Sequence, residues 1–401
     1  MKENSIFLLC WLVYFTSYIG RLNFPSVMAQ LIQWGKLTAS QAGTINMAYF
    51  LAYGMGQILN GFLGDRLKAK HMIFCGLFCS GIINGAMIFA SNYFLMALFW
   101  FFNGIFQSMI WPPLIRTLSE RLPEGERQKA GVNIVSSMVS GTLFSYLLSA
   151  FFLKFANWSF SFGFAAIDLI AISLLWLILY PTCIENKGCI GRTSLQESVD
   201  KATSLSLFDL FFKRGLFLLL IPVIIHGTIK DGVTSWIPTF ISERFGLSPS
   251  LSLIITLIIP VINLASAYWA QHLFKLLKSE TKAASVFFLT SALSLILLQT
   301  LGKQGALISG IFLAIVTASM MAVNVLFVNL IPMHFEKDNK VSTVSGLLNA
   351  LAYFGSAFAS LSIGFISERW GWDTTVFTWI TGTLVGLGVC LLIRNLSFER
   401  K

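Results

Sequence analysis

Two basic side chains lie inside long apolar stretches of the chain. Arg21 and Lys230 each stand about fifteen residues into an apolar run. A basic residue at the centre of a membrane span costs about 2.5–3.5 kcal/mol on insertion scales, so two of them at matching depth need a reason. One reason is that both cations face a common cavity and bind an anion together. The alternative is burial as ion pairs, for which Asp168 and Asp231 are the available acids.

The positions of the acids favour the anion site. No acid lies near Arg21 within its own run. Asp231 follows Lys230 directly, but adjacent residues of an α-helix point about 100° apart, so we expect this ion pair to be poorly formed. His226 precedes Lys230 by one helical turn and is either a packing residue or, with Asp231, a candidate proton-coupling group.

Polar side chains at helical spacing indicate which neighbours share the cavity. They recur every three or four residues within the runs, as on one face of a helix. In lipid, such stripes must face protein or water. The candidate cavity residues are Tyr18, Tyr53, Gln107, Trp111, Asn349 and Tyr353. The alternative role for each is a hydrogen bond between neighbouring helices.

The composition indicates what kind of element holds these residues. Apolar side chains make up 56% of the 401 residues and charged ones 11%, whereas soluble proteins have about 25% charged residues. The mean hydropathy is +0.75. A chain this apolar cannot cover itself with a hydrated surface, so its surroundings must be mostly lipid. A cytosolic enzyme, a secreted disulfide scaffold and a disordered regulator are excluded.

The net charge of +10 does not indicate nucleic acid, because the basic residues lie in short loops between apolar runs. The six cysteines are scattered and complete neither a disulfide framework nor a metal site. The sequence has no recognisable nucleotide-binding loop or catalytic constellation. We therefore expect no enzymatic activity, no cofactor and no metal.

Twelve apolar runs have the length of a membrane-spanning helix. They cover roughly 6–31, 42–63, 72–90, 93–116, 131–153, 160–180, 216–240, 248–274, 283–301, 306–331, 341–366 and 374–393. A long hydrophilic stretch separates the sixth run from the seventh. The sequence predicts an all-α integral membrane protein with six-helix bundles at 1–180 and 214–401, joined by a cytoplasmic linker at 181–213.

The basic residues also predict orientation, because cytoplasmic loops carry an excess of Lys and Arg. With the N-terminus in the cytoplasm, five of the 28 basic residues lie outside and two lie within spans, which leaves 21 on the cytoplasmic side or in the termini. We expect a multi-pass protein of the cell membrane with both termini cytoplasmic.

Matching residues recur in the two halves of the chain at a near-constant spacing. Arg21 and Lys230 are 209 residues apart, and Trp158 and Trp372 are 214 apart. A parallel repeat of six helices places substrate between the halves, near the middle of the bilayer. Asp168, in the sixth run, would be peripheral in such a repeat, so packing is favoured for it over proton handling.

A loop between the second and third runs resembles the signature of the major facilitator superfamily: GFLGDRLKAK, residues 61–70. Lys68 stands where a glycine is usual. Asp65 and Arg66 are the candidate gating residues, because a carboxylate at a helix end can pair with a neighbouring helix in one conformation only. The corresponding place in the second half, near Phe274, has no acid, so gating there would differ.

The fourth run carries a more specific resemblance. Its residues 104–113, GIFQSMIWPP, resemble the organophosphate:phosphate antiporters, which include glycerol-3-phosphate and hexose-phosphate transporters. The similarity extends over nearly the whole chain and implies two bundles of six helices, the major facilitator fold. Further matching segments are Arg116–Thr117, 21–24 (RLNF), 52–54 (AYG) and 236–239 (WIPT).

The resemblance implies that Arg21 is one of two ligands of the substrate phosphate. Lys230 stands where bacterial members usually have arginine, and lysine keeps the charge but loses the planar fork. Gln57 falls where the glycerol-3-phosphate transporter has a lysine, and Met138 where it has a central histidine. The cavity is therefore less positive, and glycerol 3-phosphate is not assigned as the substrate.

These observations predict a monomeric secondary transporter in the lipid bilayer of a bacterial cytoplasmic membrane. It would exchange a small organic anion for inorganic phosphate by alternating access, and a phosphate ester is the favoured class of anion. Two alternatives stay open: proton-coupled symport of a carboxylate through Asp231, His226 or Asp168, and a transport-inactive sugar-phosphate sensor of the same fold.

Overall fold

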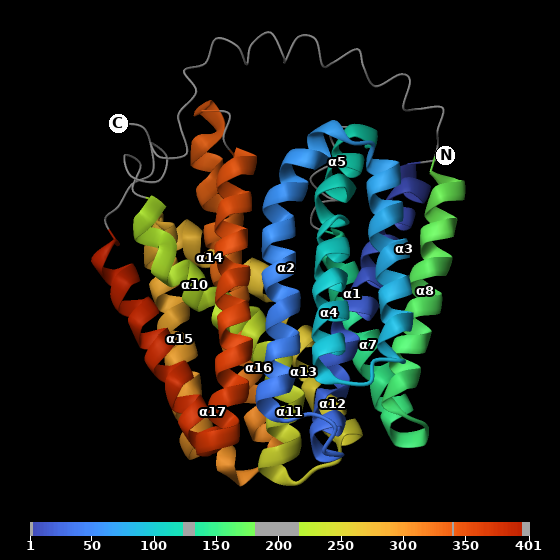
Figure 1. Ribbon diagram of the computed structural model, residues 1–401. Helices are drawn as coiled ribbons and strands as arrows, with labels where there is room; N and C mark the ends of the chain where they lie inside the picture. The colour runs from blue at the N-terminus through green and yellow to red at the C-terminus, as the bar shows by residue number, and fades with distance from the viewer. Residues whose placement is uncertain (1–2, 123–132, 181–215, 339–340, 395–401) are drawn as a thin grey trace.

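The structure is a computed structural model that describes residues 3–122, 133–180, 216–338 and 341–394. The described residues form long helices joined by short turns, without a strand among them. The first helix begins and the last helix ends at the same end of the molecule, the upper end in Figure 1, which we call the terminal end. The predicted linker at 181–213 lies outside the described residues.

Seven helices make up the described part of the first half. They are α1 (Glu3–Gln33), α2 (Ala39–Arg66), α3 (Ala69–Met87), α4 (Tyr93–Ser108), α5 (Trp111–Arg121), α7 (Val135–Phe155) and α8 (Trp158–Leu179). The fourth predicted run is split between α4 and α5. Pro112 and Pro113 stand in the first turn of α5, where they have no N–H to donate to the turn before.

The second half is more segmented. Its elements are η4 (Leu216–Leu219), α10 (Leu220–Gly227), η5 (Thr228–Val233), α11 (Thr234–Phe245), α12 (Pro249–Thr256), α13 (Ile258–Asn263), α14 (Ser266–Leu277), α15 (Glu280–Thr300), η6 (Gly302–Gln304), α16 (Ala306–Asn324), η7 (Val325–Leu330), η8 (Ile331–Asp338) and α17 (Val341–Leu392). The elements η5 and η7 are π-helical turns. The last two predicted runs both lie in α17, and Gly371, at φ 77°, turns the chain between them.

The predicted all-α membrane fold is confirmed. Nine helical stretches of the described residues are long and apolar enough to cross a membrane, and one of them, Thr343–Leu392, contains two predicted runs. The predicted runs coincide with helices except at their ends and at the breaks just described. The domain boundaries at 180 and 214 fall next to or within undescribed residues and stay a prediction.

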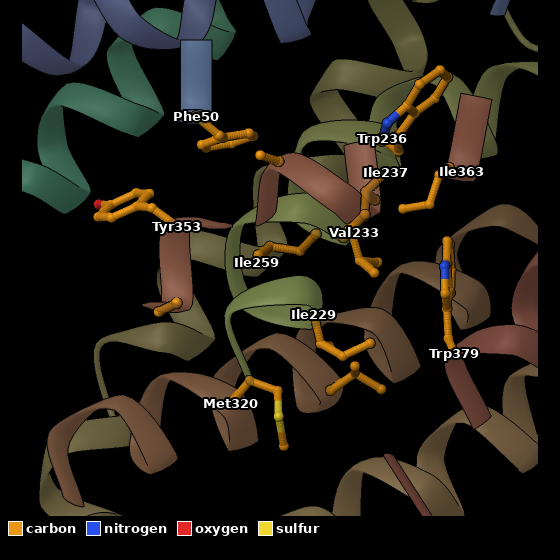
Figure 2. Close-up of a cluster of buried hydrophobic side chains, with 14 of the residues drawn as sticks. Phe50, Ile229, Val233, Trp236, Ile237, Ile259, Met320, Tyr353, Ile363 and Trp379 are labelled. Atoms are coloured by element: carbon orange, nitrogen blue, oxygen red, sulfur yellow. The ribbon is translucent and has the colours of Figure 1, made fainter. Parts of the chain in front are cut away.

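A buried apolar cluster joins the two halves (Figure 2). Val233, Trp236 and Ile237, from η5 and α11, are fully buried in it. Phe50 of α2 and Tyr353 of α17 lie at its edge, with ring centroids 6.3 Å apart. The cluster therefore packs the seventh predicted span against α17. It also joins the halves, because Phe50 of α2 lies against the ring of Tyr353.

The two halves also meet at the end opposite the termini, where α2, α11, α12 and the turn of α17 lie together (Figure 1). The close approach of α2 and α17 depends on Gly43, where a Cβ would come within 2.5 Å of the Ser360 carbonyl oxygen. Hydrogen bonds across this end are Gln33 Nε2 to Ser242 Oγ (2.8 Å), the Ser40 N–H to Glu368 Oε2 (2.7 Å), and Ser250 Oγ to the Ala150 carbonyl (2.7 Å).

Candidate functional site

Arg21 lies in the middle of α1 and is 8% exposed. Its Nη2 donates a hydrogen bond to the Tyr353 hydroxyl at 3.1 Å. The guanidinium carbon lies 4.8–5.8 Å from the ring centroids of four tyrosines, a geometry that stabilises a cation through the aromatic faces. These tyrosines are Tyr18, Tyr49, Tyr53 and Tyr353.

Lys230 reaches the same tyrosine from the other half. It belongs to the π-helical turn η5, and its Nζ lies 5.4 Å from the centroid of the Tyr353 ring. The Arg21 guanidinium carbon is 5.5 Å from that centroid. The structure thus brings the two predicted cations together around one residue of α17.

The expectation that Lys230 and Asp231 would pair poorly is wrong. Lys230 Nζ lies 2.5 Å from Asp231 Oδ2, in an ion pair whose side chains are 11% and 21% exposed. The expectation assumed α-helical rotation between neighbours. In the wider π-helical turn, hydrogen bonds run from i to i+5 and adjacent side chains diverge less, so the two head groups meet.

Arg21 is in a different electrostatic position. No carboxylate among the described residues forms an ion pair with it. A guanidinium has five N–H donors, and within the described part of the chain a single hydrogen bond, to Tyr353, uses one of them. The remaining donors suit an oxyanion that could accept two parallel hydrogen bonds.

The predicted cavity residues divide into two groups. Tyr18, Tyr53 and Tyr353 contact Arg21 directly, and Asn349 is half-buried one turn before Tyr353. Trp111 is linked to Arg21 through two tyrosines. Its ring centroid lies 4.5 Å from that of Tyr14, with the two rings tilted by 36°, and Tyr14 contacts Tyr18 edge to face at 5.3 Å. Tyr49, which also contacts Arg21, was not among the predicted site residues although it lies four residues before Tyr53 on the same polar stripe.

Gln107 lies within the first half, and no hydrogen bond among the described residues joins it to Arg21 or Lys230. Its Nε2 donates to Ser80 Oγ at 2.9 Å, and Ser80 donates to Asn103 Oδ1. Asn103 in turn donates to the Gly20 carbonyl at 3.0 Å, directly before Arg21. The network therefore holds the segment of α1 that carries Arg21. Ser80 was missed by the sequence analysis, and its signal was a polar residue inside the apolar run 72–90.

The candidate coupling and gating residues differ in their burial and in their hydrogen-bond partners. His226 is fully buried, with Nδ1 2.7 Å from the Val223 carbonyl and Nε2 3.1 Å from Asn324 Oδ1. Asp168 is half-buried on α8, and its Oδ2 has no hydrogen-bond partner among the described residues. Asp65 and Arg66 end α2, but their side chains lie outside the described part of the structure.

Known proteins resemble this chain along its whole length. The model of the Major Facilitator Superfamily matches residues 10–360. The glycerol-3-phosphate transporter of Bacillus subtilis is 25% identical, over 98% of this chain and 92% of that protein. A probable hexose phosphate transport protein of Chlamydia trachomatis is 23% identical, over 98% of this chain and 89% of that protein.

Solved structures agree on the fold. A bacterial homologue of the human lysosomal transporter Spinster superposes with a TM-score of 0.80 at 14% identity, over 100% of this chain and 98% of that one. The resemblances predicted from segments 61–70 and 104–113 are confirmed by these matches. The chain belongs to the major facilitator superfamily.

Proposed function

We propose that this protein is a secondary transporter that exchanges a small phosphate ester for inorganic phosphate by alternating access. The single observation that carries the proposal is the convergence of Arg21, from one half, and Lys230, from the other, on Tyr353. The two relatives, a glycerol-3-phosphate transporter and a probable hexose phosphate transport protein, support a phosphate ester as the substrate class.

Binding would begin at Arg21. Its planar fork can donate two parallel hydrogen bonds to a tetrahedral oxyanion, and the bound anion would replace the Tyr353 hydroxyl as acceptor. Lys230 would approach the same anion as a point charge from η5. One ligand would then neutralise cations of both halves, which favours states in which the halves move together.

The same charges account for exchange. Without an anion, reorientation would move a buried guanidinium that forms no ion pair with a described carboxylate. Burial of an unneutralised charge is unfavourable, so the protein would reorient mainly when loaded. We propose a monomer with cytoplasmic termini, in which bundles 1–180 and 214–401 rock about the site. The end opposite the termini, where Ser40 contacts Glu368 and which we call the closed end, would then face outward.

Arg21→Gln tests the site. The change removes the charge and the fork, so phosphate binding measured by calorimetry should weaken by at least about tenfold, from loss of a charged hydrogen bond of about 1.5–3 kcal/mol. Arg244→Gln is the matched control, because Arg244 pairs with Asp373 at the closed end, outside the site. If Arg21→Gln binds phosphate as the wild type does, the site is misassigned.

Proteoliposomes test the coupling. Exchange requires phosphate inside the vesicles, so phosphate-free vesicles should show no uptake with or without a pH gradient. Symport coupled to protons through Asp231, His226 or Asp168 should give uptake driven by a pH gradient into phosphate-free vesicles. A sensor would bind phosphate esters in calorimetry and give no counterflow of labelled substrate.

A further inference from the structure

The charged groups at the site do not balance. Arg21 and Lys230 contribute two positive charges and Asp231 one negative charge, which leaves a net charge of +1. The aromatic neighbours of the cations are neutral phenols. His226, one turn before Lys230, has its ring nitrogens within hydrogen-bond distance of the Val223 carbonyl and Asn324 Oδ1. One unit of positive charge is therefore available to a ligand.

We propose that Asp231 sets the charge of the ligand, so that the site accepts anions carrying one net negative charge in preference to dianions. This inference rests on the proposed function. A monoanion brings the total charge of site and ligand to zero. A dianion leaves one uncompensated negative charge in a partly buried site, where charge is poorly solvated.

The backbone holds Asp231 at this place. Gly232, the next residue, packs on α17 so closely that a Cβ there would come within 2.5 Å of the Ala359 Cβ. Thr228, at the start of η5, donates a hydrogen bond to the Gly355 carbonyl of α17 at 3.2 Å. Both ends of the π-helical turn are thus tied to the helix that carries Tyr353. The Asp231 side chain is 21% exposed, so a ligand can come near it.

A simpler role for Asp231 is to neutralise Lys230. The two roles differ in their consequences. If Asp231 acts on Lys230 alone and its charge has no effect at the ligand, its removal leaves the ratio between the affinities for a monoanion and a dianion unchanged. If it sets the ligand charge, its removal favours a dianion more than a monoanion, because the second negative charge no longer meets a carboxylate.

Two three-carbon diols serve as probes at pH 8. Glycerol 3-phosphate is mostly a dianion there, since the second pKa of a phosphate monoester is about 6. 2,3-Dihydroxypropane-1-sulfonate is a monoanion at any pH. The measured quantity is the dissociation constant of the sulfonate divided by that of the phosphate, by calorimetry. Comparing this ratio between variants cancels any fixed difference in hydrogen bonding between the two head groups.

Four proteins form a charge series. The wild type has a site charge of +1, Asp231→Asn of +2, Lys230→Gln of zero, and the double variant again of +1. The ratio should rise by roughly tenfold or more in Asp231→Asn, the effect of one unit charge at close range in partly solvated protein. It should fall in Lys230→Gln and return near the wild-type value in the double variant.

Misfolding of one variant does not prevent the test. If Asp231→Asn does not fold, the double variant compared with Lys230→Gln removes the same carboxylate without leaving an unpaired lysine. Asp373→Asn, which removes an acid at the closed end, is the matched control and should leave the ratio unchanged. An unchanged ratio in Asp231→Asn, or a double variant that resembles Asp231→Asn, overturns the inference. A wild type that binds neither probe and does not bind inorganic phosphate contradicts the proposed function instead.

Discussion

At the scale of single residues, Arg21 is stabilised without being neutralised. The faces of four tyrosines surround it, and a neutral hydroxyl accepts its hydrogen bond. A carboxylate in the same place would compete with an incoming anion for the guanidinium. Aromatic faces offset part of the desolvation of the cation, and the N–H donors that Tyr353 does not use have no hydrogen-bond acceptor among the described residues. This arrangement suits a residue that must hold and release an anion repeatedly.

Tyr353→Phe separates the ring from the hydroxyl. The ring contacts of both cations remain, and Arg21 loses the acceptor that competes with a ligand. We expect phosphate affinity in calorimetry to stay within a few-fold of the wild type or to rise, with thermal stability reduced by about 1–3 kcal/mol. Tyr146→Phe, buried in α7, is the control. Loss of phosphate binding in Tyr353→Phe would mean that the hydroxyl itself binds the ligand.

At the scale of elements, the sequence identified the helices better than their internal breaks. The break before α5 is readable from Pro112 and Pro113. The π-helical turn η5 is not, because the segment TIKDGV contains no proline or other fixed signal. We attribute its hydrogen-bond pattern to packing on α17, which Gly227 and Gly232 approach closely. Arg21 and Lys230 could be picked out as candidates because each is a charge inside an apolar run. The pairing of Lys230 with Asp231 could not be predicted, because it depends on this π-helical turn.

Gly227→Ala tests whether close packing shapes η5. A Cβ at Gly227, the residue before η5, would overlap the backbone of Ala352 on α17, which cannot move aside as a side chain could. We expect the free energy of unfolding to fall by about 1–3 kcal/mol, seen as a lower midpoint of thermal unfolding. Phosphate binding should also weaken as η5 shifts. Gly382→Ala is the matched control, because a Cβ there meets nothing within 4 Å. Equal stability of the two variants would contradict this account.

At the scale of the whole molecule, contacts between the halves hold the end opposite the termini closed. Glu368, next to the turn of α17, accepts a hydrogen bond at 2.7 Å from the N–H of Ser40, at the start of α2. A carboxylate at a helix N-terminus interacts favourably with the helix dipole. The sequence predicted two halves of six helices but not which end is closed, because alternating states of one sequence differ by only a few kcal/mol.

Glu368→Gln should therefore open this end more often. The change removes a charged hydrogen bond and a charge at a helix N-terminus, about 1–2 kcal/mol together, or roughly a five- to thirtyfold shift between states. Spin labels at Trp34 and Trp370, exposed residues of the two halves, would report it as a larger fraction of long distances. Asp373→Asn breaks an ion pair inside the second half at the same end and should change nothing. An unchanged distance distribution in Glu368→Gln would show that apolar packing alone closes this end.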